Sequence, residues 1–329
     1  MGRSIAANAF TFLILMIAAL GGFIAWAQGQ FRNEGPLTED LVIEVVRGAT
    51  LGGISENLLY VGAISNEQIF RIGARYTQRD TKLKFGEYVL PAGSSMDEIL
   101  DILVEGKSIQ YFVTIPEGMY IAEIVARINA NEDLTGEIEN LPTEGMLAPN
   151  TYSFQRGDTR QSVVDRMFEA QIAILDAAWE GRAEGLPLAS KEELLILASI
   201  VESEAGGAGE WGLVASVFYN RLAVNMRLQA DATLRYGLTD GKERLRGRLF
   251  QSQLDKVTAY NTYQIAGLTP TPISNPGRDA ILATANPETS KFYYFVLDGS
   301  GGHAFAKSLQ EHNRNVAAWR KIERERSSN

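Results

Sequence analysis

The sequence predicts an α+β protein with an N-terminal transmembrane helix, a small α+β module and then a larger mixed α+β domain. Three observations predict it: a long apolar run at the start, recurring strand–turn–helix units behind it, and long helical patterns that end in a pair of short strands. The chain has 329 residues, which is enough for one large domain or two modest ones with a real core.

The composition excludes several kinds of chemistry. With 45% hydrophobic and 22% charged residues the chain is an ordinary globular protein, and it contains no cysteine and two histidines. Disulfides, thiol nucleophiles, thiolate zinc sites and iron–sulfur clusters are therefore excluded, and little remains for a histidine metal site or a Ser-His-Asp triad. A net charge of -9 argues against a nucleic-acid partner. We expect no metal and no cofactor, and chemistry by carboxylates, hydroxyls and amides.

The N-terminus predicts a membrane anchor. The chain is almost entirely apolar from Ile5 to Trp26, and ~20 apolar residues are enough to span a bilayer as a helix. The small-x-small sequence Ala25-Trp26-Ala27 leaves a cleaved signal peptide as an alternative. The single basic residue before the run and the length of the run favour an uncleaved anchor over 1–27, followed by a polar linker over 28–40.

The next part of the chain shows a weak internal repeat. VVRGATLGGI, VLPAGSSMDEI and VTIPEGMYIAEI each place β-branched residues before a Gly, and an Ile follows that Gly by six positions. We expect a small α+β module over 41–108, which could bind a ligand or only space the next domain over 109–329. The predicted strands are 41–46, 86–90 and 109–115, and the predicted helices are 50–61, 66–77, 95–105 and 119–130, with caps at Ser65 and at the pair Ser95 and Glu98.

The larger domain has fewer regular patterns. We expect loops over 131–158, where EGMLAPNTYSF lies, and an extended segment over 226–238. The terminal segment KFYYFVLDGSGGHAFAKS predicts a strand, an Asp-Gly turn and a second strand. The helices that we predict span 159–180, 191–205, 210–225 and 309–324.

The helix KEELLILASIVESEA carries the candidate chemistry. Ser190 and Glu193 predict a capping box at its start, and Gly206-Gly207 predict its end. A helical wheel places apolar side chains almost all round, with a polar edge of Ser199 and Ser203, so we expect the helix to be buried.

Two glutamates lie in the last turn of this helix, Glu202 and Glu204. Burial and the negative end of the helix dipole both raise a carboxyl pKa, as a general acid at a glycosidic oxygen requires. Because the two are separated by two positions, they point to nearly opposite sides. Either could instead only bond to backbone N–H groups, and the residues alone do not choose between them.

Aromatic and amide side chains cluster further along, in MRLQADATLRYGL and AYNTYQIAGLTPTPISNPG. Rings stack on sugar faces and amides bind sugar hydroxyls, so these segments predict a glycan groove, although Tyr260 and Tyr263 could be ordinary core tyrosines. His303 is more readily structural than substrate-binding, and His312 is expected at the surface. The chain has no phosphate-binding G-x-x-x-x-G-K-[ST], no G-x-S-x-G, no S-x-x-K and no H-E-x-x-H motif.

Five ordered segments, ASIVESEA, VASVFYNRL, MRLQADATLRYG, AYNTYQIAGLTPTPISNPG and FYYFVLDGSGGHAF, resemble the endolytic murein transglycosylase (YceG-like) family. VTIPEGMYIAEI and EGMLAPNTYSF resemble it too, so the likeness covers about 40–318. It implies a single-pass protein of the bacterial inner membrane, with a LysM-like module and then a catalytic domain that faces the cell wall. The family's catalytic glutamate, the first of its S-I-V-E-x-E motif, corresponds to Glu202.

The resemblance implies cleavage of the bond between N-acetylmuramic acid and N-acetylglucosamine without water, by one carboxyl, inside nascent glycan strands. The muramyl 6-hydroxyl then closes a 1,6-anhydro ring. Ala230 and Ala232, and GLTPTPI in place of a double-proline form, depart from the family pattern and put subsite details in doubt. The residues that we expect to line the groove or to hold the acid are Glu204, Asn220, Gln229, Asp231, Tyr260, Asn261 and Tyr263.

Two alternatives stay open. One is a non-catalytic peptidoglycan-binding scaffold of the elongation or division machinery, and the other is a hydrolytic muramidase, for which Asp231 is the candidate second carboxylate. The partners expected are peptidoglycan glycan strands, the inner membrane and peptidoglycan synthases.

Overall fold

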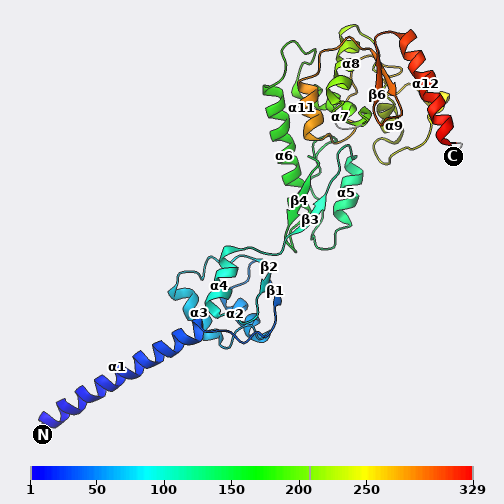
Figure 1. The fold of residues 1–329 in the computed structure, drawn as a ribbon. Coiled ribbons are helices and arrows are strands. Elements are labelled where there is room, and N and C mark those ends of the chain that lie inside the picture. Colours follow the sequence, from blue (N-terminus) through cyan, green and yellow to red (C-terminus); the bar gives the residue numbers. More distant parts are fainter. Residues whose placement is uncertain (1, 207–208, 328–329) are drawn as a thin grey trace. The chain divides into compact units, whose positions relative to one another are not determined.

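The computed structural model describes residues 2–206 and 209–327, and it divides the chain into two compact units (Figure 1). Unit 1 comprises Met1–Tyr111 and Ser153–Asp158, and unit 2 comprises Phe112–Tyr152 and Thr159–Asn329. Within the described residues the strands form three two-stranded sheets among many helices. The prediction of a mixed α+β fold is confirmed.

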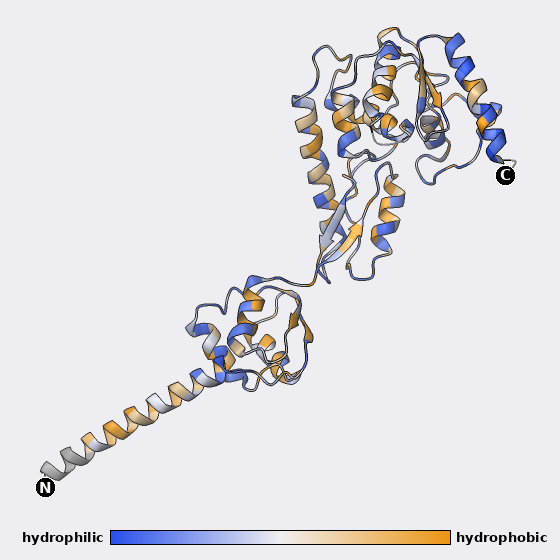
Figure 2. Cartoon of the chain, in the orientation of Figure 1, coloured by the Kyte–Doolittle hydropathy of each residue, from blue (hydrophilic) through white to orange (hydrophobic). Residues whose placement is uncertain are grey.

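The first helix, α1 (Gly2–Arg32), contains the predicted apolar run. Its segment Ala9–Arg32 is long and apolar enough to cross a membrane, and none of its most apolar window is buried; Figure 2 shows the apolar residues along it. The helix continues into the segment expected to be a linker, and Phe31 is buried in the core of unit 1. The Phe31 ring lies so close to the Cα of Gly73 that a side chain there would collide with it.

Unit 1 packs helices against one small sheet. Strand β1 (Leu41–Val45) pairs antiparallel with β2 (Gly86–Leu90), with Leu41 opposite Leu90. Between the strands lie α2 (Leu51–Tyr60) and α3 (Glu67–Tyr76), and α4 (Met96–Glu105) follows β2. The capping box of Ser95 and Glu98 is confirmed. The cap predicted at Ser65 was wrong by one residue, because the Asn66 carboxamide accepts the N–H groups of Gln68 and Ile69.

Unit 2 is mostly helical. Its helices are α5 (Ile121–Asn129), α6 (Arg160–Glu180), α7 (Lys191–Glu204), α8 (Trp211–Ala223), α9 (Asp231–Thr239), α10 (Gln251–Leu254), α11 (Arg278–Ala285) and α12 (Leu309–Ser327). Strand β3 (Tyr111–Thr114) pairs with β4 (Thr151–Phe154), and the unit boundaries of the chain fall within these two strands; β4 lies where only loops were expected. The predicted hairpin is confirmed as β5 (Tyr294–Leu297) paired with β6 (His303–Ala306).

Helix α7 lies in the core of unit 2. Every residue from Leu194 to Val201 is buried, as the wheel predicted, and α6, α8, α9 and α11 pack around the helix. Ser199 was expected at a polar edge but is fully buried; its hydroxyl donates to the Ile196 carbonyl and accepts the Ile273 N–H. The helix ends at Glu204, and Gly207 lies outside the described residues.

The prediction of an extended segment over 226–238 was wrong for its second half, which forms α9. The order of apolar and polar residues there fits the repeat of a strand as well as the repeat of a helix. In the structure, Thr233, Leu234 and Tyr236 are the buried residues of the helix. No side chain caps this helix at Ala230. Instead the Glu204 carboxylate accepts the Ala232 N–H in its first turn, a contact between two helices that the local sequence does not predict.

Candidate active site

Glu202 lies in the last turn of α7, between the loops 116–119 and 274–277. Its Oε2 accepts the Gly277 N–H at 3.0 Å, and the side chain is half-buried. Gly118 faces it from the other loop, where a Cβ in place of the glycine hydrogen would lie 3.5 Å from the Glu202 Cγ. A glycine of each loop, Gly118 or Gly277, therefore lies next to the Glu202 side chain.

The surroundings of Glu202 keep it partly protonated at neutral pH. Burial raises its pKa to about 7, with smaller increases from the negative charges of Glu117 and Asp279. The Gly277 N–H acts in the opposite direction, because it stabilises the carboxylate form. Such a group can both donate and accept a proton near neutrality.

Asn275 holds the two loops around Glu202. Its buried carboxamide donates to the Met119 carbonyl at 3.0 Å and to Glu144 Oε1 at 2.7 Å, and it accepts the Leu147 N–H at 2.9 Å. Its backbone also bonds to Gly118 and Met119. Sequence reasoning missed Asn275 because its partners lie far away in the chain.

Glu144 is the buried acceptor of this network and was also missed. Both of its oxygens accept the Ile121 N–H, and burial raises its pKa to about 7. It lies in EGMLAPNTYSF, and an acid in an irregular segment has no periodicity that would place it in a core. Its polar contacts compensate part of the cost of burying it.

Serine hydroxyls fasten the second loop to α7. Ser274 donates to the Ser199 carbonyl at 3.1 Å, and its hydroxyl lies 3.2 Å from that of Ser203. With the Ile273 N–H bound to Ser199, the loop is fixed along the same helix that carries Glu202. The acid and its hydrogen-bond donor Gly277 therefore belong to one rigid part of unit 2.

Glu204 points into different surroundings, as its spacing from Glu202 predicted. It lines a cavity of about 440 Å³ together with Gln229, Asp231 and Tyr263. Burial raises the Glu204 pKa to about 7, and the charge of Asp231 raises it further. The Tyr263 hydroxyl donates to Asp231 Oδ1 at 2.6 Å. The structure thus brings four predicted residues together and places Asp231 beside Glu204.

The other three predicted residues hold loops and do not line this cavity. Asn220 donates to the carbonyls of Ser290 and Phe292. Asn261 is fully buried and donates to the carbonyls of residues 254 and 256. The Tyr260 hydroxyl bonds to Thr271, and its ring packs 5.1 Å from that of Tyr236.

The two histidines have structural contacts. The backbone N–H of His303 donates to Glu210 Oε1 at 2.8 Å, and Glu210 Oε2 lies 2.8 Å from His303 Nδ1. His312 was expected at the surface, which was wrong: it is half-buried and stacked 5.1 Å from Tyr294, because α12 packs on β5. Among the described residues, no group of three or more His, Asp or Glu side chains could hold a metal ion.

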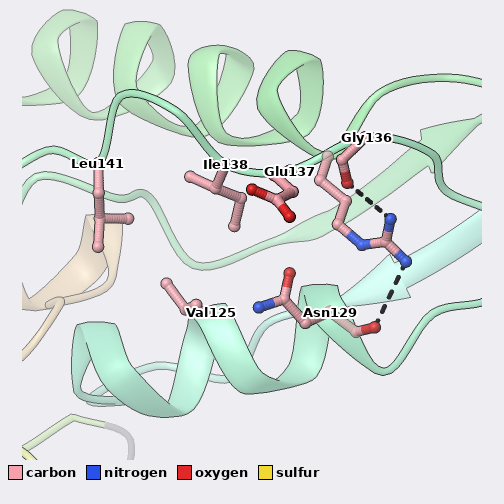
Figure 3. A pocket seen from close by; sticks show the side chains of 7 residues that line it. Val125, Asn129, Gly136, Glu137, Ile138 and Leu141 are labelled. Atoms are coloured by element: carbon pink, nitrogen blue, oxygen red, sulfur yellow. Dashed lines mark hydrogen bonds between the residues drawn. The ribbon is translucent and has the colours of Figure 1, made fainter.

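A further cavity of about 420 Å³ lies between α5 and the loop 136–141 (Figure 3). Arg160 is one of the residues that line it, and its guanidinium donates to the carbonyls of Gly136, Asn129 and Asn131. No predicted site residue lines this cavity. Arg160 is the one cationic residue that lines the cavity, and its guanidinium is bound to backbone carbonyls. We therefore assign Arg160 a structural role.

A half-buried carboxyl with a pKa near neutrality, braced by a buried amide network, has the features of a general acid–base site. The sequence model of the YceG-like family matches residues 43–318. The chain belongs to this family, as the resemblance predicted.

Two kinds of relatives agree with this membership. Proteins named endolytic murein transglycosylase from Bacillus subtilis strain 168 and Streptococcus pneumoniae strain D39 are 28% and 29% identical to this chain, over 83% and 84% of it. The matches cover 82% of the Bacillus protein and 58% of the pneumococcal protein. A crystal structure of a yceG-like protein from Listeria monocytogenes aligns with a TM-score of 0.52 at 29% identity, over 84% of this chain and 98% of that one.

Replacing Glu204 by Gln is expected to stabilise the protein more at pH 8 than at pH 5. The native pKa of about 7 lies above the unfolded value of 4.5, so the native state binds more protons and loses stability as pH rises from about 4.5 to 7. Gln can still accept the Ala232 N–H. We expect the gain at pH 8 to exceed that at pH 5 by roughly 2 kcal/mol, measured by urea unfolding; an equal gain at both values would contradict the burial argument.

The Asn275→Ala variant is expected to lose about 2–4 kcal/mol of unfolding free energy, because Glu144, Leu147 and Met119 lose buried partners. The matched control is Asn313→Ala on exposed α12, which should change stability by less than about 0.5 kcal/mol. Urea unfolding of both variants tests this. Similar losses in the two variants would show that the network is not the source.

Proposed function

We propose that this chain is an endolytic peptidoglycan lytic transglycosylase in which Glu202 acts first as general acid and then as general base. It would cleave the MurNAc–GlcNAc bond inside nascent strands and leave 1,6-anhydroMurNAc ends. The observation that carries the proposal is the half-buried Glu202 with a pKa of about 7, at the motif position of the catalytic glutamate in a YceG-like chain. The activity named for the relatives supports the same reaction.

The reaction needs one carboxyl. Protonated Glu202 gives its proton to the glycosidic oxygen, and the bond from that oxygen to C1 of the muramyl residue breaks. The Glu202 carboxylate then takes the proton of the muramyl 6-hydroxyl, whose oxygen bonds to C1. Glu202 ends as it began and no water is consumed. The Gly277 N–H supports the carboxylate that exists between the two steps.

A hydrolytic muramidase is the second candidate, and it requires another carboxylate to position water. Asp231 was its candidate from sequence, but this residue bonds to Tyr263 beside Glu204. The acids whose charges act on Glu202 are Glu117 and Asp279, both exposed. We favour the lytic reaction because relatives of this chain are named endolytic murein transglycosylase.

The proposal extends to the organisation of the whole chain. Residues 1–27 anchor it once in the bacterial cytoplasmic membrane, residues 28–40 lead to a LysM-like module over 41–108, and the domain over 109–329 acts on the wall. The apolar segment of α1 supports the anchor, and the strand–helix–helix–strand order of unit 1 around its own core supports the small module. In this arrangement the enzyme terminates glycan strands, with peptidoglycan synthases as candidate partners.

Digestion of purified peptidoglycan tests the reaction. We expect products with 1,6-anhydro ends in mass spectrometry, and a loss of at least about 100-fold in rate for Glu202→Gln, which keeps the Gly277 contact but cannot donate the proton. The control Glu204→Gln should lose far less. Hydrated reducing ends would support the muramidase instead, and strand binding without cleavage would support the scaffold.

The rate is also expected to depend on pH in one direction. The donor form of Glu202 is lost above its pKa of about 7, so kcat/KM should be level below that value and fall about tenfold per unit above it. Initial rates between about pH 5 and 9 measure this. A profile that stays level to pH 9 would show that Glu202 is not the proton donor.

A further inference from the structure

A basic loop lies beside the proposed acid. Residues 242–248, with the sequence KERLRGR, contain four basic side chains and one acidic one in a chain whose net charge is -9. The basic residues are Lys242, Arg244, Arg246 and Arg248, and all four are exposed. We call residues 242–248 the basic loop.

Two side chains of α9 hold the basic loop in place. Arg235 on α9 donates to its Leu245 and Gly247 carbonyls at 3.1 and 2.8 Å, and Thr239 donates to its Glu243 carbonyl at 2.8 Å. These contacts fix where the exposed cations project.

The basic loop is also tied to the loop that faces Glu202. Arg244 donates to the Gly118 carbonyl at 2.5 Å, pairs with Glu123 at 3.0 Å and lies 4.5 Å above the Tyr120 ring. Gly118 is the residue whose backbone flanks the Glu202 side chain. Gly118 therefore lies between the basic loop and the Glu202 side chain.

The guanidinium groups of Arg246 and Arg248 are available to a ligand, although the charge of Arg246 also acts on Glu123. Arg244 is occupied by Gly118 and Glu123, whereas the guanidinium groups of Arg246 and Arg248 form no hydrogen bond or ion pair within the described part of the chain. A guanidinium pairs well with a carboxylate because it offers two parallel N–H donors. The expected ligand is an anion that reaches Glu202 at the same time.

The proposed substrate has such an anion. The muramyl residue whose C1–O bond breaks also carries, at C3, a lactyl group and a peptide stem with free carboxylates. We propose that the basic loop binds the stem-peptide carboxylates of the muramyl residue being cut, so that the enzyme prefers peptide-bearing strands. This inference rests on the proposed function, which supplies the substrate.

The test compares intact strands with strands whose peptides an amidase has removed and whose newly exposed lactyl carboxylates have been converted to methyl amides, so that no anion remains at C3. For the double variant Arg246→Gln/Arg248→Gln we expect KM on peptide-bearing strands to rise roughly three- to tenfold, as the loss of two exposed ion pairs predicts. On peptide-free strands KM should change less than about twofold. The difference should shrink in about 0.5 M salt, which screens exposed charges.

The matched control is Arg314→Gln/Arg320→Gln, which removes the same charge from exposed α12. An equal loss on both kinds of strand, no loss on either, or an equal loss in the control would overturn the proposal. Binding of both strands to protein carrying Glu202→Gln, with and without the loop substitutions, repeats the comparison without cleavage. If the wild type cuts nothing, the proposed function fails while this binding comparison still decides the role of the loop.

Discussion

The burial of α7 from Leu194 to Val201 is the constraint on which the rest of unit 2 depends. Each buried Leu, Ile or Val side chain contributes about 1.5–3 kcal/mol, so the segment can bear the cost of the carboxyls that follow it. The same burial aligns Ser199 with the loop that carries Ser274 and Gly277. Once that loop is fixed, the N–H that contacts Glu202 is fixed as well.

Among the described residues of unit 2, three glutamates have a pKa raised to about 7, and in each case burial is the main cause. The pKa alone therefore does not identify a proton donor. Glu144 has both oxygens occupied in a buried network, and Glu204 supports the first turn of α9. Glu202 accepts one N–H, that of Gly277, and is only half-buried, so of the three it is the glutamate that we propose as the proton donor.

The sequence predicted what depends on local periodicity and spacing. The apolar wheel of α7 predicted its burial, and the separation of Glu202 from Glu204 predicted their different surroundings. It did not predict contacts made across the chain: Asn275 and Glu144 lie 131 positions apart, and the first turn of α9 uses a carboxylate from α7. At Ser190 the hydroxyl accepts the Glu193 N–H as predicted, but the Glu193 carboxylate turns back to the Ala189 N–H. Irregular segments hide their long-range partners because nothing in their pattern marks a buried face.

The balance of forces on Glu202 suits a reaction in which one group must both give and take a proton. A carboxyl kept neutral by burial alone would be a good acid and then a poorly stabilised carboxylate. The Gly277 N–H offsets part of that cost without removing it, and the charges of Glu117 and Asp279 favour the protonated form from which the proposed reaction starts. A pKa near 7 leaves both forms within about 1.4 kcal/mol of each other at one pH unit from neutrality. The causes of this balance are the burial of Glu202, the Gly277 N–H and the charges of two exposed carboxylates, Glu117 and Asp279.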